Sequence, residues 1–450
     1  MKYFRSRIAA MGGSLPARKR RAVALEVPPL SAFEAQLKST EAREISTTMA
    51  FVRILNTVIR DKKIGKFVVP IVPDESRTFG MEGMFRQFGI YSSVGQLYTP
   101  QDADQLMFYK EDKTGQMLQE GINEAGAMSS WIAAATAYAN HGQMMMPFYI
   151  FYSMFGFQRI GDLAWAAGDM RARGFLLGGT AGRTTLNGEG LQHEDGHSHL
   201  MAATIPNCIS YDPTFSYELA VIIQDGMRRM YQEQEDVFYY ITVMNENYTH
   251  PAMPEGVEKG ILRGMYLFAE GGAAAHAGGK AKKNQPRVQL LGSGTILREV
   301  IAAAAMLDKD YGVAADIWSV TSFNELRRDG LDAQRWNTLH PEAAPRLSYV
   351  EQCLKDRAGP VVAATDYMKN YADQIRAFMP AQHYTVLGTD GFGRSDTRRA
   401  LRRFFEVDRN YVAVAALKAL ADQEAIPRAT VTEAIKRYSI DTEKPSPTSV

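Results

Sequence analysis

Short apolar segments that alternate with helical segments constrain the fold of this chain more than any other feature. The helical segments between them, such as residues 154–173 and 217–232, carry apolar side chains at helical spacing. Strands buried on both faces are continuously apolar, and their alternation with helices predicts parallel sheets with right-handed crossovers. The apolar segments are residues 67–72, 145–152, 175–177, 207–210 and 237–244. The fold class is therefore expected to be α/β.

The alternation is interrupted once, by a small, polar, Gly/Ala-rich segment, and then resumes. The later apolar segments are residues 288–291, 314–320, 361–364 and 384–387. This pattern predicts two three-layer α/β domains with mainly parallel sheets. We expect a tail or linker over residues 1–38, a first domain over 39–268, a connecting segment over 269–286 and a second domain over 287–450.

The charge balance gives no reason to expect a nucleic-acid or membrane partner. The chain has 51 Lys and Arg against 50 Asp and Glu, so it has no strong overall field. Its longest apolar run, residues 144–157, contains Pro147 and is shorter than the roughly 20 residues that span a bilayer. Cys208 and Cys353 follow no metal-binding spacing and fit a reducing, cytoplasmic setting.

A polar, glycine-rich loop lies between the apolar segments 175–177 and 207–210. Its residues 190–199 read GLQHEDGHSH and present His193, His197 and His199 beside two acids. Polar loops at strand ends are where α/β sheets place their chemistry. The run is not a helical HExxH zinc motif, because a glycine interrupts it. A catalytic or substrate-orienting histidine is the stronger hypothesis, and no metal ligands are predicted.

Other candidate positions are ambiguous on spacing alone. Glu124 opens a helical segment. An acid there is either an ordinary first-turn residue favoured by the helix dipole or a carboxylate positioned for a functional role. Glu75 lies in a polar cluster after residues 67–72, which is typical of a solvated turn. Phe155 belongs to an aromatic stripe that usually indicates core. The sequences GSG at 292–294 and GFG at 391–393 are not dinucleotide-binding motifs, and tight turns explain them equally well.

Longer motifs carry a resemblance to a known family. They are DESRTFGMEGMFRQFGIY (74–91), EGINEAG (120–126), FYSMFGFQRIGDLAWAAGD (151–169), GLQHEDGHSH with IPNCISYDP (190–213) and LGTDGFGRSD (387–396). The chain resembles the homodimeric, bacterial-type decarboxylating component of the pyruvate dehydrogenase complex, a transketolase-like thiamine diphosphate enzyme. It resembles that family's middle, pyrimidine-binding domain (39–268) and its transketolase C-terminal-like domain (287–450).

The resemblance implies roles for matching residues. Glu124 would hydrogen-bond the aminopyrimidine ring of thiamine diphosphate and favour the tautomer that accepts the thiazolium proton. Phe155 would pack on that ring, and Tyr152, Arg159 and Glu75 would belong to the surrounding polar network. His193 would face pyruvate. Residues 94–110 would form a loop that orders over the occupied site and excludes water.

The resemblance also implies partners. The family's motif for pyrophosphate and Mg²⁺ is not found in the sequence, so a domain absent from this chain is expected to hold both. The chain would then act as a homodimer or as a heteromer with a pyrophosphate-binding domain. The two-carbon unit would pass to the lipoyl group of dihydrolipoamide acetyltransferase. The isolated chain is expected to be inactive.

Two alternatives of other kinds remain. One is a transketolase-like enzyme that acts on phosphorylated sugars, and the other is a non-catalytic dimerising remnant. The first is weakened by the form HEDGHSH, since sugar-phosphate enzymes of this type resemble GEDGPTHQ instead. The second is weakened by the presence of Glu124 and His193.

Overall fold

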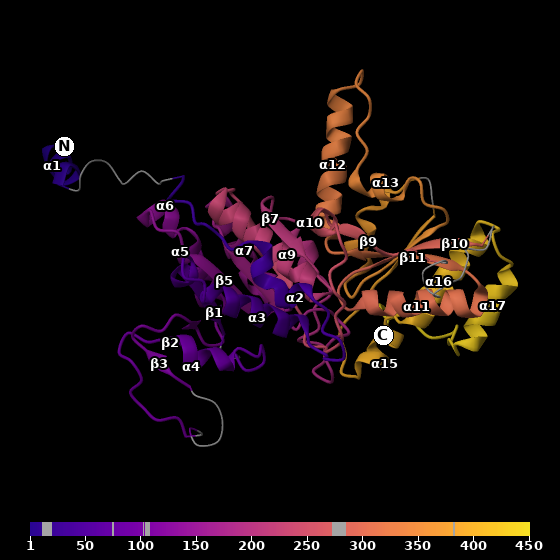
Figure 1. Ribbon diagram of the computed structural model, residues 1–450, viewed down its shortest axis with the longest axis horizontal. Coiled ribbons are helices and arrows are strands. Elements are labelled where there is room, and N and C mark those ends of the chain that lie inside the picture. Colours follow the sequence, from indigo (N-terminus) through magenta and orange to yellow (C-terminus); the bar gives the residue numbers. More distant parts are fainter. Residues whose placement is uncertain (11–19, 74–75, 102, 104–108, 272–284, 381–382) are drawn as a thin grey trace.

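The protein folds into two α/β units that lie side by side (Figure 1). The structure, a computed structural model, describes residues 1–10, 20–73, 76–101, 103, 109–271, 285–380 and 383–450. The first unit occupies the left of Figure 1 and the second the right. Within these described ranges no helix has the length and apolar character needed to cross a bilayer.

The first unit contains a six-stranded sheet in which all neighbours are parallel, as the apolar pattern predicts. Nearly every strand residue is buried, because helices cover both faces. In spatial order the strands are β4 (Leu118–Gln119), β1 (Val68–Val72), β5 (Met146–Tyr152), β6 (Phe175–Gly179), β8 (Phe238–Thr242) and β7 (Cys208–Tyr211).

Alternate residues of the strands serve the two faces of the first sheet. Phe148 and Ile150 of β5 pack with α3 (Thr47–Ile59) and α9 (Ser216–Met227). Tyr149 of the same strand packs with the helices of the opposite face, α5 (Glu124–Ala135) and α7 (Gly156–Asp169). The two-residue period of a strand thus produces the expected three layers.

The second unit has a five-stranded sheet that is parallel except at one edge. In spatial order its strands are β13 (Tyr384–Leu387), β12 (Val361–Ala364), β10 (Arg287–Gly292), β11 (Ala314–Val320) and β9 (Met265–Ala269). The edge strand β9 is antiparallel to β11 and is an element that the sequence pattern did not reveal. It crosses the expected boundary at residue 268, so the second sheet recruits chain from before that boundary.

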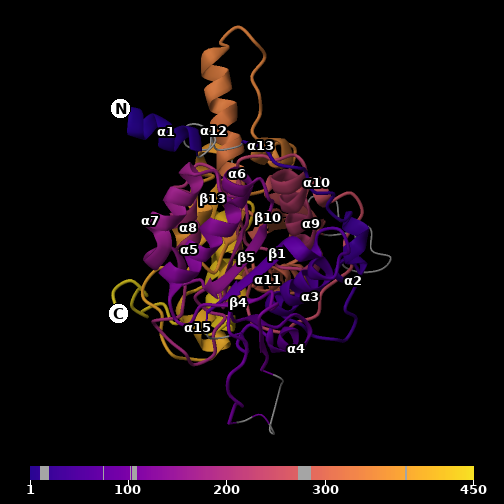
Figure 2. The same cartoon turned by 90° about the vertical axis from the view of Figure 1, so that its left-hand side faces the viewer.

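Helices also cover both faces of the second sheet. One face packs against α11 (Ile296–Tyr311), α16 (Arg409–Asp422) and α17 (Arg428–Arg437). The other packs against α12 (Phe323–Leu339), α13 (Tyr349–Leu354) and α14 (Lys369–Asp373). The outer part of α12 projects from the body of the molecule in both views (Figures 1 and 2).

The remaining elements are short. Two of them, β2 and β3, form a small parallel ladder on either side of residues 94–110. This is the loop expected to order over the occupied site, and its residues 102 and 104–108 lie outside the described residues. These elements are α1 (Lys2–Ala10), α2 (Glu34–Leu37), α4 (Phe85–Phe88), β2 (Ile90–Tyr91), β3 (Glu111–Asp112), α6 (Ala137–His141), α8 (Ser198–Ala202), α10 (Glu258–Arg263) and α15 (Arg398–Phe404), with 3-10 turns Leu30–Phe33, Gly65–Phe67, Glu82–Met84 and Arg376–Phe378 and a π-helical turn Arg228–Gln232.

Part of the expected N-terminal tail is folded against the first unit. Val27 and Phe33 are buried and join the same apolar cluster as α9. The N–H of Leu25 donates to the carbonyl of Tyr231. Chain that lacks apolar periodicity of its own is therefore ordered here by packing on a neighbouring helix.

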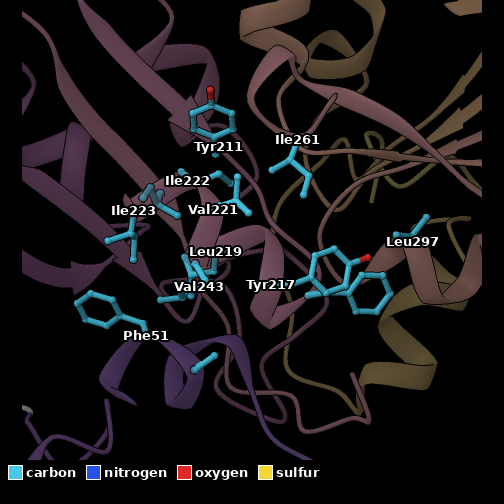
Figure 3. Close-up of a cluster of buried hydrophobic side chains, with 14 of the residues drawn as sticks. Phe51, Tyr211, Tyr217, Leu219, Val221, Ile222, Ile223, Val243, Ile261 and Leu297 are labelled. Atoms are coloured by element: carbon cyan, nitrogen blue, oxygen red, sulfur yellow. The ribbon is translucent and has the colours of Figure 1, made fainter. Parts of the chain in front are cut away.

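A continuous apolar cluster joins the two units. Figure 3 shows Tyr217 of α9 next to Leu297 of α11, with Ile261 of α10 nearby. Glu218 follows Tyr217 and is fully buried, where it accepts hydrogen bonds from Ser319 Oγ (2.6 Å) and Tyr266 Oη (2.7 Å) of the second unit. This shared core sets the position of one unit relative to the other.

Candidate active site

Five of the six predicted site residues come together at the carboxyl-terminal edge of the first sheet. Tyr152 is the last residue of β5, Phe155 immediately precedes α7, and Arg159 lies in the first turns of α7. Glu124 opens α5, which follows β4, and His193 lies in the loop that follows β6. Parallel strands place their carboxyl ends at one edge, so residues far apart in sequence meet there. The sixth, Glu75, lies outside the described residues.

Glu124 is held at a capped helix start. The side chain of Asn123 accepts a hydrogen bond from the N–H of Gly126 at 3.0 Å and so caps α5. Glu124 Oε1 accepts a hydrogen bond from Arg159 Nη1 at 2.6 Å, and the Glu124 side chain is 13% exposed. The carboxylate is thus orientated by a neighbouring helix while one edge stays accessible.

Three rings form an aromatic cluster beside this carboxylate. The ring centroids of Tyr152 and Phe155 each lie 5.0 Å from that of His193, and both pairs are edge-to-face. The Arg159 guanidinium lies 4.3 Å from the centroid of the Phe155 ring. The buried Phe79 ring supports Tyr152 from behind at 5.4 Å. The Phe155 ring is thus only partly buried and contacts charged and polar groups.

His193 is held by a turn and keeps an imidazole nitrogen without a hydrogen bond. The backbone N–H of His193 donates a hydrogen bond to the carbonyl of Gly190 at 3.1 Å. Nδ1 of His193 is buried and makes no hydrogen bond to any described residue, although Glu189 Oε2 lies 3.4 Å away. A buried polar atom without a partner is costly unless a ligand or water satisfies it. The His193 imidazole thus has a hydrogen-bonding capacity that no described residue satisfies.

The loop at residues 190–199 is here called the histidine loop, and its other charged residues stabilise its conformation. Asp195 Oδ1 accepts hydrogen bonds from the N–H groups of His197 (2.9 Å) and Ser198 (3.0 Å), which starts α8. Glu194 is fully buried, and its Oε2 accepts a hydrogen bond from the N–H of Arg394 at 2.8 Å. Burial raises the pKa of Glu194 to about 7, since the charged form is poorly solvated.

His199 belongs to the core behind the site. It is fully buried, stacks on Tyr371 with centroids 4.8 Å apart, and its Nε2 lies 3.0 Å from Thr242 Oγ1. Burial lowers the pKa of His199 to about 3, so this imidazole is neutral at physiological pH. His197 instead lies at the surface edge, with Nε2 2.9 Å from Gln158 Nε2. Among the described residues no group of three His, Cys, Asp or Glu is arranged to hold a metal ion.

Two glycines allow close contacts with the loop, one within the first unit and one from the second unit. A Cβ on Gly196 would lie 2.0 Å from Arg183 Nη2, and one on Gly393 would lie 2.7 Å from Glu194 Oε2. Gly393 of the GFG sequence at 391–393 therefore packs closely against the histidine loop. Glu189, Phe79 and the contact of Glu194 with residue 394 were not predicted. Only Glu189, one helical turn before His193 in sequence, offered a local signal.

Comparison with known proteins follows the division into two units. The sequence model described as Pyruvate dehydrogenase E1 component middle domain matches residues 25–251, about half of the chain. The model described as Transketolase-like TK C-terminal domain matches residues 272–408.

Curated relatives match the whole chain at high identity. The Pyruvate dehydrogenase E1 component of Cupriavidus necator is 67% identical over 100% of this chain and 49% of its own length. That of Escherichia coli K12 is 58% identical over 99% of this chain and 49% of its own length. The chain therefore spans about half the length of the curated relatives it matches.

Solved structures show the same fold at low identity. Transketolase from Campylobacter jejuni superposes with a TM-score of 0.61 at 16% identity, over 86% of this chain and 49% of its own. A structure titled split gene transketolase, inactive beta4 tetramer, has a TM-score of 0.52 at 15% identity, over 84% of this chain and 98% of its own. The two units thus have the transketolase-like fold.

Proposed function

The chain belongs to the pyruvate dehydrogenase E1 component family, and we propose that it forms the pyrimidine-binding side of an active site that decarboxylates pyruvate with thiamine diphosphate. The observation that carries this proposal is the cluster of Glu124, Phe155 and His193 at one sheet edge. A carboxylate at a helix start, an aromatic ring and an imidazole are the groups that an aminopyrimidine and a 2-oxo acid require. Residues 39–268 and 287–450 would be the pyrimidine-binding and C-terminal domains.

The residues present fit the cofactor by their chemistry. Glu124 keeps an accessible edge while Arg159 holds Oε1, so the carboxylate can accept a hydrogen bond from a ring N–H. Phe155 and Tyr152 would pack against the ring, and Arg159 would fix the carboxylate. When bound, thiamine diphosphate supplies the electron sink for loss of carbon dioxide from a 2-oxo acid.

His193 would orient the substrate. Its buried Nδ1 lacks a hydrogen-bond partner among the described residues, and its ring lies against Tyr152 and Phe155. An imidazole N–H there can donate to the carbonyl or carboxylate oxygen of pyruvate. The aromatic rings on either side exclude water, which strengthens that hydrogen bond. Glu75 and the loop at residues 94–110 would complete this side of the site.

The proposed partners follow from the family. A pyrophosphate-binding domain, in a homodimer or a heteromer, would hold the pyrophosphate and Mg²⁺. The lipoyl group of dihydrolipoamide acetyltransferase would take up the two-carbon unit, in a cytoplasmic pyruvate dehydrogenase complex. Both cysteines are free thiols in this structure, which suits a reducing compartment.

Complementation tests the proposal directly. The 450-residue chain would be mixed with the half of the Cupriavidus necator relative that it does not match, with pyruvate, thiamine diphosphate and Mg²⁺. We expect carbon dioxide release from the mixture and none from either part alone. A stable complex of the two parts that releases no carbon dioxide would refute the proposed function. Release by the chain alone would refute its dependence on a pyrophosphate-binding domain.

A further inference from the structure

An arginine-lined cavity of about 590 Å³ lies at the junction of the two units, apart from the site described above. It is large enough for a small-molecule ligand. None of Glu124, Tyr152, Phe155, Arg159 and His193 lines it. It is here called the arginine cavity. Its lining residues are Glu246 after β8, Arg298 and Glu299 of α11, Arg398, Arg399 and Arg402 of α15, Asp408, and Arg409 and Asn410 of α16.

The two glutamates of the arginine cavity are already neutralised by arginines. Glu246 is paired with Arg298 at 2.7 Å and with the buried Arg402. Glu299 is paired with Arg409 at 2.9 Å and with Arg402 at 3.6 Å. Each carboxylate thus has two guanidinium partners, so neither is free to neutralise a further cation.

The third acid of the cavity is engaged by its own helix. Asp408 Oδ1 accepts hydrogen bonds from the N–H groups of Asn410 (2.9 Å) and Tyr411 (3.0 Å), which caps α16. Arg403 Nη1 lies a further 3.8 Å from Asp408 Oδ2. All three carboxyl groups of the cavity therefore have their own partners.

Two arginines of the cavity have no carboxylate partner among the described residues. Arg398 donates from Nε to the carbonyl of Thr185, and Arg399 is exposed and makes no interaction with any described residue. The five arginines and three acids leave an excess of two positive charges. Burial lowers the pKa of Arg398, and the charge of Glu246 opposes this effect while the charges of Arg402 and Arg298 add to it.

We propose that the arginine cavity binds a multivalent phosphate anion, such as a diphosphate or a phosphate ester. Guanidinium groups present paired N–H donors that match phosphate oxygens, and Arg398 and Arg399 are the two groups free to do so. Partial burial strengthens the attraction, since the local dielectric constant is lower than in water. The ligand would lie near Asn187 of the first unit, whose Oδ1 accepts a hydrogen bond from the N–H of Arg398 at 3.1 Å.

Calorimetric titration of the full 450-residue chain with inorganic pyrophosphate, without magnesium, tests the proposal. We expect one saturable site that weakens as ionic strength rises. Each of Arg398→Ala and Arg399→Ala should raise the dissociation constant about tenfold, because each removes charged hydrogen bonds to phosphate. Inorganic phosphate, which has fewer oxygens to engage, should bind more weakly.

Matched variants decide between a built site and diffuse charge. Arg335→Ala removes an exposed arginine on α12 outside the cavity and should leave pyrophosphate binding unchanged, as should Glu124→Gln. Equal weakening by Arg335→Ala, loss of binding in Glu124→Gln, or no saturable binding at all would overturn the proposal. If Arg398→Ala unfolds the chain, Arg399→Ala decides, because that exposed side chain has no partner among the described residues.

Discussion

Arg159 Nη1 donates a hydrogen bond to Glu124 Oε1 at 2.6 Å, which joins the first turns of α5 and α7 at the mouth of the proposed site. The same guanidinium lies over the ring of Phe155 at 4.3 Å. One side chain thus orients both the carboxylate and the aromatic ring that the cofactor would contact. The next three predictions concern these groups, each measured in the complemented enzyme described above.

Glu124→Gln should abolish pyruvate decarboxylation while leaving the fold intact. A neutral amide cannot stabilise the ring protonation that the carboxylate supports, so we expect at least a 100-fold loss of kcat by analogy with general acid–base groups. The Arg159 partner is half-exposed, so losing the ion pair should cost at most about 1 kcal/mol of unfolding free energy. Asp162→Asn, at an exposed position of α7, is the matched control for kcat. Unchanged turnover in Glu124→Gln would remove Glu124 from the mechanism.

Arg159→Ala should raise KM for thiamine diphosphate several-fold and reduce kcat less than Glu124→Gln does. The carboxylate would remain but lose its orienting hydrogen bond, so cofactor binding should weaken more than the rate of the chemical step falls. Arg159→Lys should recover part of the effect, since an ammonium can pair with Glu124 but lacks the planar group that covers Phe155. Equal losses of kcat in the Arg159→Ala and Glu124→Gln variants would contradict the prediction that Arg159 affects cofactor binding more than chemistry.

Phe155→Ala should weaken thiamine diphosphate binding about tenfold, because it removes both apolar area and an aromatic face. Phe155→Leu keeps most of the apolar bulk and should lie between wild type and Phe155→Ala. The measurement is the half-saturating cofactor concentration at fixed pyruvate. If both variants bind the cofactor as the wild type does, the ring has no part in cofactor binding.

Glu194→Gln should change how stability depends on pH. The folded chain holds the Glu194 proton up to a pKa of about 7, against an ordinary value of 4.5. The unfolded chain releases its proton first, so the Glu194 contribution to unfolding free energy falls as pH rises from about 4.5 to 7. Glutamine lacks this loss. The unfolding free energy of the variant should therefore rise relative to that of the wild type between pH 5 and 8. From the size of the pKa shift, the relative increase is on the order of 3 kcal/mol.

Denaturant unfolding at several pH values measures this difference. The buried groups Asp212 and Asp366, whose pKa values burial raises to about 7, cancel because both proteins contain them. A free-energy difference between variant and wild type that stays constant from pH 5 to 8 would contradict the protonation of buried Glu194.

Arg402→Ala should destabilise the junction of the two units by about 3–5 kcal/mol, the usual cost of breaking a buried ion pair. The Arg402 side chain is 7% exposed and its removal would leave Glu246 and Glu299 buried with fewer partners. Lys418→Ala, which breaks an exposed pair with Asp422, should cost below 1 kcal/mol. Similar losses in chemical denaturation for both variants would show that burial does not set the strength of these pairs.

Strands with a continuous apolar run could be predicted closely from sequence. The segments 314–320 and 361–364 coincide with β11 and β12, whose residues are all buried, and 384–387 coincides with the edge strand β13, where only Tyr384 is buried. The edge strand β9 was missed although its residues are apolar; as in the predicted edge strand β13, its later residues Leu267, Phe268 and Ala269 are only partly buried.

The candidate site residues were proposed from sequence, while their contacts and burial were decided by tertiary structure. Motifs pointed to Glu124, Phe155 and His193, whose grouping follows from parallel strands that end at one edge. Spacing alone could not pair Glu124 with Arg159 or separate His193 from His199, since contacts across tens of residues leave no local pattern. Glu194 holds its proton near neutral pH because its side chain is buried, although the N–H of Arg394 favours the charged form. Desolvation of that kind exists only once the second unit packs against the histidine loop.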